Sequence, residues 1–109
     1  MTTKRRYKKT ELIQFVFKVL QKVGLNNLNS KTVAELIVRA DVRGVWSHGI
    51  VRLPVYIKRI EKKSAKINPS IKFKKITNNI FHLSGDNGLG YIAASVGIKK
   101  CVSLAKKME

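Results

Sequence analysis

The stretch from residue 40 to residue 56 most constrains the fold, because two helix-ending signals lie close together in it. Arg43-Gly44 carries one of them, since a glycine at the end of an apolar helical pattern is a common stop. Pro54 is the other, because a helix from upstream cannot run through a proline. A proline is tolerated only in the first turn of a helix. We therefore expect one helix to end near Arg43-Gly44 and another to begin at residues 50–53 and to reach about Lys62.

Two segments before this stretch have apolar residues at helical spacing. Residues 10–23 predict an amphipathic helix, which Gly24 ends. Asn29 or Ser30 can cap a second helix. The predicted apolar face of this second helix consists of Val33, Leu36, Ile37 and Ala40.

The second half of the chain changes from helical to β-type periodicity. Residues 71–76 and 80–83 are short β-type runs, and the Asn pair in the intervening segment 77–79 suits the positive backbone angles of a tight hairpin turn. A loop at 85–90 then leads into a final helix at 89–107. The sequence therefore predicts an α+β fold, with N-terminal helices followed by a short β-hairpin and a helix.

Length and composition limit the chain to one domain, from residue 10 to residue 109, after a disordered basic N-terminus at 1–9. The apolar runs are too short to span a bilayer or to form a signal peptide, which predicts a cytoplasmic protein without membrane contact. The single cysteine, Cys101, excludes an internal disulfide. Its setting in an apolar helical pattern predicts a small buried side chain.

The chain carries 23 basic and 6 acidic residues, a formal net charge of +17. Apart from a cluster at residues 4–9, the cations are spread over every predicted element, and most are lysines. Direct reading of bases favours Arg, Asn and Gln on one presenting helix, and no such helix stands out. We expect no specific nucleic-acid binding, although weak attraction to polyanions at low salt follows from the charge alone.

The same stretch, 40–56, gathers side chains that can hold a carboxylate and move a proton. An arginine fork such as that of Arg52 fits a carboxylate with two hydrogen bonds, and His48 can gain or lose a proton near neutral pH. The hydroxyl groups of Ser47 and Tyr56 can orient a neighbouring oxygen. If the segment after residue 49 is helical, positions 52, 56 and 59 share one face, with His48 one turn earlier.

Each of these residues also has a structural interpretation. Arg52 can form a salt bridge with Asp41 or Glu61, and His48 can be a buried structural histidine. Asp41 and Arg43 are expected to fix the turn beneath the site. Other polar residues are expected to be surface groups without a site role, namely Lys58, Arg59 and His82.

Three motifs in order resemble the N-terminal part of the type 2 malate/L-lactate dehydrogenase family, from about residue 11 to the end. They are Ser47-His48-Gly49-x-x-Arg52-Leu53-Pro54, Ile67-Asn68-Pro69 and Gly85-Asp-Asn-Gly-Leu-Gly90. That family also includes sulfolactate, ureidoglycolate and Δ1-piperideine-2-carboxylate dehydrogenases or reductases. Trp46 departs from the usual acidic or small residue, and residues 64–66 replace a glycine-containing turn. Family enzymes are much longer, so we expect this chain to be an N-terminal fragment that is inactive alone.

The resemblance implies a non-Rossmann fold and an NAD- or NADP-dependent enzyme that transfers a hydride to or from a 2-hydroxy or 2-oxo acid, or a cyclic imino acid. It implies that Arg52 grips the substrate carboxylate, with Ser47, His48 and Tyr56 as further substrate contacts and His48 as the proton-transfer candidate. It also implies a homodimer. The substrate, the choice between NAD and NADP, and the cofactor-binding residues stay open. The alternative class is a non-catalytic basic helical module that binds a partner protein or nucleic acid.

A second glycine pattern invites a different interpretation. The segment 88–93, G-L-G-Y-I-A, matches the phosphate loop of a Rossmann fold, which requires a parallel βαβ unit around it. The chain ends before a second parallel strand could complete that unit. We therefore interpret these glycines as shaping a strand-to-helix turn.

Overall fold

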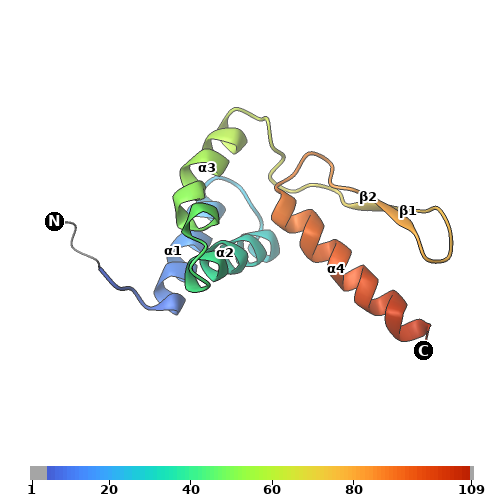
Figure 1. Ribbon diagram of the computed structural model, residues 1–109. Coiled ribbons are helices and arrows are strands. Elements are labelled where there is room, and N and C mark those ends of the chain that lie inside the picture. Colours follow the sequence, from blue (N-terminus) through green and yellow to red (C-terminus); the bar gives the residue numbers. More distant parts are fainter. Residues whose placement is uncertain (1–4, 109) are drawn as a thin grey trace.

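The computed structural model describes residues 5–108 and contains four α-helices, two 3-10 turns and one β-hairpin (Figure 1). In chain order the elements are α1 (Lys9–Lys22), α2 (Asn27–Val42), η1 (Trp46–His48), η2 (Ile50–Arg52), α3 (Leu53–Glu61), β1 (Lys72–Lys75), β2 (Phe81–Ser84) and α4 (Gly90–Lys107). This order confirms the predicted α+β fold. Of the N-terminal segment predicted to be disordered, residues 1–4 lie outside the described residues, and Lys9 already belongs to α1.

The core lies between α1, α2 and α3, as the apolar spacing of their sequences requires. Two faces of helical periodicity meet here, and burying them removes apolar surface from water. The buried apolar side chains of these three helices are Val16, Leu20, Val33, Ala34, Ile37, Val38, Leu53 and Ile60. On α2 the predicted face is confirmed at Val33 and Ile37, whereas Leu36 and Ala40 are only half-buried.

The turn between α1 and α2 begins where predicted, but its cap differs. Gly24 has φ +114°, a left-handed value that suits glycine and ends α1. The prediction that Asn29 or Ser30 caps α2 is wrong. Asn26 is the cap, and its side-chain oxygen accepts a hydrogen bond from the Asn29 backbone N–H at 2.8 Å. The buried Ser30 hydroxyl donates to the Leu25 carbonyl at 3.2 Å, so it is satisfied inside the first turn.

The segment before α3 follows the prediction closely. Helix α2 ends at Val42, and Gly44 has φ +78° just beyond it. A 3-10 turn, η2, precedes α3, and Pro54 lies in the first turn of α3, where its missing N–H breaks no helical hydrogen bond.

The strands β1 and β2 form an antiparallel hairpin with Phe73 opposite Leu83. The positive backbone angles predicted for the Asn pair of the turn are wrong, because among residues 5–108 the non-glycine residues with positive φ lie elsewhere. Thr77 shapes this turn instead. Its hydroxyl accepts hydrogen bonds from the backbone N–H groups of Asn79 at 3.2 Å and Ile80 at 3.1 Å.

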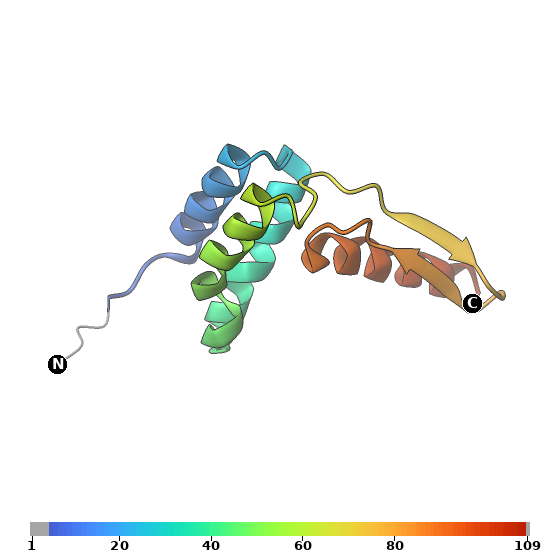
Figure 2. The same cartoon turned by 90° about the horizontal axis from the view of Figure 1, so that it is seen from above.

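Helix α4 packs on the hairpin and touches α2 near its own start (Figure 2). The Lys100 ammonium lies 5.5 Å from the ring centroids of both Phe73 and Phe81, which is within cation–π range. Ile92 is the buried residue of this helix. The prediction that Cys101 is buried is wrong: its thiol is exposed, because only one side of α4 is covered.

Within residues 5–108, no helix combines the length and the apolar character needed to cross a membrane.

Candidate functional site

The turn between α2 and α3 is built around the carboxylate of Asp41. Its Oδ2 accepts a hydrogen bond from the Ile50 backbone N–H at 2.8 Å. Gly49 is buried against the same carboxylate, and a Cβ at this position would lie 2.1 Å from Asp41 Oδ1. Only glycine therefore fits here. The predicted role of Asp41 beneath the turn is confirmed, whereas Arg43 contributes its backbone N–H to the helix end and has an exposed side chain.

Ser47 and His48 lie in the turn η1, and their side chains meet. The distance from Ser47 Oγ to His48 Nδ1 is 2.8 Å, so the hydroxyl and the ring share a hydrogen bond. Both side chains are exposed, which excludes the interpretation of His48 as a buried structural histidine. The bond occupies Nδ1 and leaves Nε2 as the ring nitrogen for other partners.

The Arg52 guanidinium is anchored to the same turn. Its Nε donates to the Ser47 carbonyl oxygen at 2.8 Å. The alternative ion pairs with Asp41 and Glu61 do not form within residues 5–108, where the recorded ion pair joins Lys66 to Asp86. Because only Nε is engaged, the two terminal nitrogens of the fork are available to a carboxylate.

Tyr56 contacts a residue that sequence reasoning missed. Its hydroxyl lies 3.0 Å from that of Tyr91, and the two rings meet edge to face with centroids 5.6 Å apart. Burial raises the pKa of the Tyr91 phenol, the hydrogen bond with Tyr56 raises it further, and the positive charge of Arg52 lowers it. Tyr91 sits in the first turn of α4, after the glycine-containing loop, and no pattern in the sequence marked it as a partner of Tyr56.

The predicted polar face on α3 is present in part. The Arg59 guanidinium carbon lies 6.0 Å from the centroid of the Tyr56 ring, so these two positions are neighbours. Against the larger effect of burial, the positive charge of Arg52 lowers the pKa of the Tyr91 phenol. A pocket of about 450 Å³ opens beside this group, with Tyr56, Arg59 and Tyr91 in its lining. The structure thus brings Ser47, His48 and Arg52 together on one side, and Tyr56 with Tyr91 on the other.

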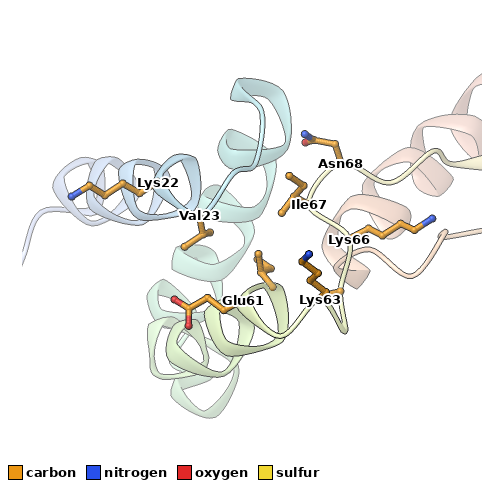
Figure 3. A pocket seen from close by; sticks show the side chains of 9 residues that line it. Lys22, Val23, Glu61, Lys63, Lys66, Ile67 and Asn68 are labelled. Carbon is orange, nitrogen blue, oxygen red and sulfur yellow. The ribbon is translucent and has the colours of Figure 1, made fainter.

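A larger pocket, of about 950 Å³, lies at the C-terminal ends of α1 and α3 (Figure 3). Val23, Ile60 and Ile67 form its apolar wall, while the ammonium groups of Lys22 and Lys66 point away from its centre. It contains none of the predicted site residues. We interpret it as a gap in packing beside the loop that follows α3.

The loop at 85–90 does not fit a dinucleotide phosphate. The hairpin before it is antiparallel, so α4 does not follow a parallel strand of a βαβ unit. The space at Gly88 is filled by the chain itself, because a Cβ there would lie 2.3 Å from Pro69 Cγ. The left-handed residues of the loop are Asp86 and Asn87. The interpretation of this motif as a strand-to-helix turn is confirmed.

The remaining polar candidates stay outside the cluster. His82 lies on β2 with an exposed side chain, as predicted for a strand residue. Within the part of the chain that the structure describes, no group of three or more His, Cys, Asp or Glu residues is placed to hold a metal ion.

Comparison with known proteins identifies relatives of this chain. The malate dehydrogenase of Pyrococcus abyssi is 34% identical over 102 residues, which cover 94% of this chain and 28% of the relative. The ureidoglycolate dehydrogenase (NAD(+)) of Escherichia coli strain K12 is 33% identical over 96 residues, 88% of this chain and 28% of the relative. The structure of malate dehydrogenase from Pyrococcus horikoshii superposes with a TM-score of 0.90 at 33% identity, covering 94% of this chain and 30% of that one.

The chain therefore spans about 28% of the length of these curated relatives. Its fold, with helices, hairpin and α4 in the same arrangement, is that of the corresponding part of the Pyrococcus horikoshii structure. The family model described as malate/L-lactate dehydrogenase matches residues 7–108, nearly the whole chain. This chain belongs to the malate/L-lactate dehydrogenase family.

Proposed function

We propose that this chain is the N-terminal segment of an NAD(P)-dependent oxidoreductase. The whole enzyme would transfer a hydride between a nicotinamide and C2 of a 2-hydroxy or 2-oxo acid of the malate/lactate type, or of a cyclic imino acid. The observation that carries the proposal is the Arg52 guanidinium, anchored by Nε beside the Ser47–His48 pair. The dehydrogenase relatives support it.

Arg52 would bind the substrate carboxylate. With Nε held at 2.8 Å by the Ser47 carbonyl, the planar fork is oriented before the substrate arrives. Two parallel N–H···O bonds to one carboxylate fix both its position and its plane, which a single ammonium charge does not. Substrate C2 is bonded directly to that carboxylate carbon, so gripping the carboxylate also positions C2.

His48 would transfer the proton at the C2 oxygen. When Nδ1–H donates to the Ser47 hydroxyl oxygen, the neutral ring has its free lone pair on Nε2. In the oxidation of a 2-hydroxy acid, Nε2 accepts the hydroxyl proton and the ring becomes an imidazolium; as a 2-oxo acid is reduced, the imidazolium returns that proton to the C2 oxygen. Ser47 thus selects the tautomer that the reaction requires, and Tyr56 is the fourth substrate contact.

The nicotinamide supplies or accepts the hydride when it is bound. The loop at 85–90 is not the cofactor's phosphate cradle, because Pro69 fills the space at Gly88. The residues of this chain that we assign to the reaction are those that bind the acid and move its proton. The same proposal includes a homodimer and a cytoplasmic location. It leaves open whether the cofactor is NAD or NADP.

The test is Arg52→Lys in a chimera whose residues 7–108 replace the matching segment of the Pyrococcus horikoshii malate dehydrogenase. Loss of a charge-assisted contact is worth roughly 1.5–3 kcal/mol, so kcat/KM for malate should fall about ten- to hundredfold. Arg43→Lys is the matched control, because that side chain is exposed and lies outside the cluster. Normal kcat/KM in Arg52→Lys would make Arg52 a structural residue.

The 109-residue chain by itself should show no dehydrogenase activity, because hydride transfer needs a cofactor held at near-attack distance. The measurement is NADH and NADPH oxidation with several 2-oxo acids after repeated purification. Protein-dependent turnover that survives purification would contradict this.

The net charge of +17 is the observation that favours a second candidate function, a basic module that binds nucleic acid or an acidic partner. Attraction by charge alone should be independent of base sequence and should collapse between low and physiological salt. Binding to duplexes of unrelated sequence, measured over a salt series, distinguishes attraction by charge alone from specific nucleic-acid binding. Tight binding of one sequence at physiological salt would favour the second candidate.

A further inference from the structure

We infer that Tyr91 is a positioning residue of the proposed acid-binding site: its hydroxyl donates to Tyr56 and thereby directs the Tyr56 O–H toward the acid that Arg52 holds. The inference rests on the proposed function and adds a residue to it. Tyr91 comes from α4, whereas the other members of the site come from η1, η2 and α3. The site would then span both halves of the molecule.

The contact between the two phenols is specific in distance and in orientation. Their oxygens are 3.0 Å apart, and the rings meet at an interplanar angle of 84° with centroids 5.6 Å apart. Edge-to-face packing holds each ring in one orientation, so the hydroxyl groups have little freedom to part. Both side chains are half-buried, which protects the hydrogen bond from competition with water.

Each hydroxyl carries a single proton, so the phenol that accepts the bond keeps its own proton for another partner. We assign Tyr91 as the donor because Tyr56, on α3 four residues after Arg52, is the phenol placed to contact the acid; the raised pKa of Tyr91, caused by burial and by this bond, agrees with a phenol that stays protonated. The Tyr56 oxygen then accepts this bond, and its own proton is directed elsewhere. A substrate oxygen is a suitable acceptor for it.

Arg52 places that acceptor within reach. Burial and the bond to Tyr56 raise the pKa of the Tyr91 phenol, and the positive charge of Arg52 lowers that pKa by less. Arg52 also precedes Tyr56 by four residues, one helical turn. The pocket of about 450 Å³ beside both rings has Tyr56, Arg59 and Tyr91 in its lining, and Arg52 lies outside that lining. An acid whose carboxylate is bound by Arg52 would therefore reach Tyr56 through another of its oxygens.

The first experiment tests whether Tyr91 holds its proton more tightly than an exposed tyrosine does. At about pH 11, a unit above the ordinary tyrosine pKa of about 10, the near-ultraviolet absorbance of phenolate reports which phenols have ionised. Tyr91→Phe should leave this absorbance unchanged, whereas Tyr7→Phe, at an exposed position, should lower it. Circular dichroism at the same pH confirms that the chain stays folded. An equal fall in both variants would overturn the inference.

The second experiment tests positioning, with L-malate as the probe and NMR chemical shifts of the 109-residue chain as the readout. Tyr91→Phe keeps the ring and removes one neutral hydrogen bond, so the malate Kd should rise roughly two- to tenfold. Tyr56→Phe should raise it by the same factor, and the double variant should add nothing further, because the two hydroxyls act as one unit. Tyr7→Phe is the control.

The outcomes separate the two claims. Malate binding that Tyr91→Phe leaves unchanged overturns the role of Tyr91 and leaves the proposed function standing. Effects of Tyr56→Phe and Tyr91→Phe that simply add also overturn it, since the phenols would then act independently. Absence of malate binding by the unsubstituted chain overturns this inference, whereas the proposed function is decided separately by the Arg52→Lys chimera.

Discussion

The helical half of the molecule and its β-hairpin half differ in how they are held together. Helices α1, α2 and α3 enclose a core in which Leu20 and Ile37 are fully buried. The hairpin with α4 has no such core: every residue of β1 is exposed, and α4 buries Ile92 alone. Apolar side chains of this half that remain exposed are Phe73, Ile76, Ile80, Ile98, Val102 and Met108.

The overall dimensions reflect this difference. The Cα radius of gyration is 16.0 Å, whereas a compact domain of this length has a value of about 13 Å. The two halves meet mainly where α4 starts beside α2, which is also where Tyr91 reaches Tyr56. The site therefore combines a rigidly packed half, which carries Arg52, with a half whose own packing is thin.

The largest expected effect comes from removing core volume in the helical half. Leu20→Ala should lower the free energy of unfolding by about 2–5 kcal/mol, because Leu20 is fully buried and the cavity cannot collapse completely. Ile80→Ala, at a side chain 58% exposed, should cost less than about 0.5 kcal/mol. Urea unfolding followed by circular dichroism measures both. Similar losses for the two variants would mean that the hairpin half has a core of its own.

The same contrast explains how much of the fold could be predicted. Helical periodicity revealed α1, α2 and α3 because one face of each is buried, and burial is what makes apolar spacing regular. In α4 the pattern gave the helix but misplaced Cys101, because a helix covered on one side leaves apolar positions exposed. Local hydrogen bonds were the other source of error, since Asn26 rather than Asn29 caps α2.

For the site, residues close in sequence were predictable and their long-range partner was not. Ser47, His48 and Arg52 lie in one short segment, and the structure joins them by hydrogen bonds. Tyr91 lies 35 positions from Tyr56, and its approach depends on how α4 docks beside α2. No local pattern in the sequence encodes that docking.

A medium effect is expected at the turn that carries the site. Gly49→Ala places a Cβ against the Asp41 carboxylate and should destabilise the chain by roughly 1–3 kcal/mol through overpacking. The matched control is Gly90→Ala in the hairpin half. Its Cβ would meet nothing within 4 Å, so alanine at this helical position should stabilise by about 0.4–1 kcal/mol. Thermal unfolding measures the stability of both variants. If Gly49→Ala and Gly90→Ala change it in the same direction, the geometry of the turn is contradicted.

The smallest effect is expected at the ion pair that ties the segment after α3 to the loop before α4. Asp86 Oδ1 accepts from the Lys66 ammonium at 2.7 Å, and Oδ2 accepts from the Ser70 backbone N–H at 2.9 Å. These two bonds, Lys66 first, hold the pKa of Asp86 below its ordinary value of 3.8. A carboxyl group whose pKa is lower in the folded chain than in the unfolded chain stabilises the fold at pH values above its unfolded-state pKa. This stabilisation is lost as the pH falls through its folded-state pKa.

The corresponding prediction is that Asp86→Asn flattens the loss of stability below about pH 4 and changes little near neutral pH, because both groups are solvent-exposed. Asn keeps an acceptor for Ser70 and tolerates the left-handed φ of +50° at this position. Lys66→Gln should also reduce the loss of stability below about pH 4. The double variant should show no further reduction, since one ion pair is responsible for both effects. Thermal unfolding over a pH series measures all three. If the unsubstituted chain and Asp86→Asn lose stability in parallel as the pH falls, the pair does not couple the two halves, and the docking of α4 rests on the contacts of Ile92 and the Tyr56–Tyr91 bond.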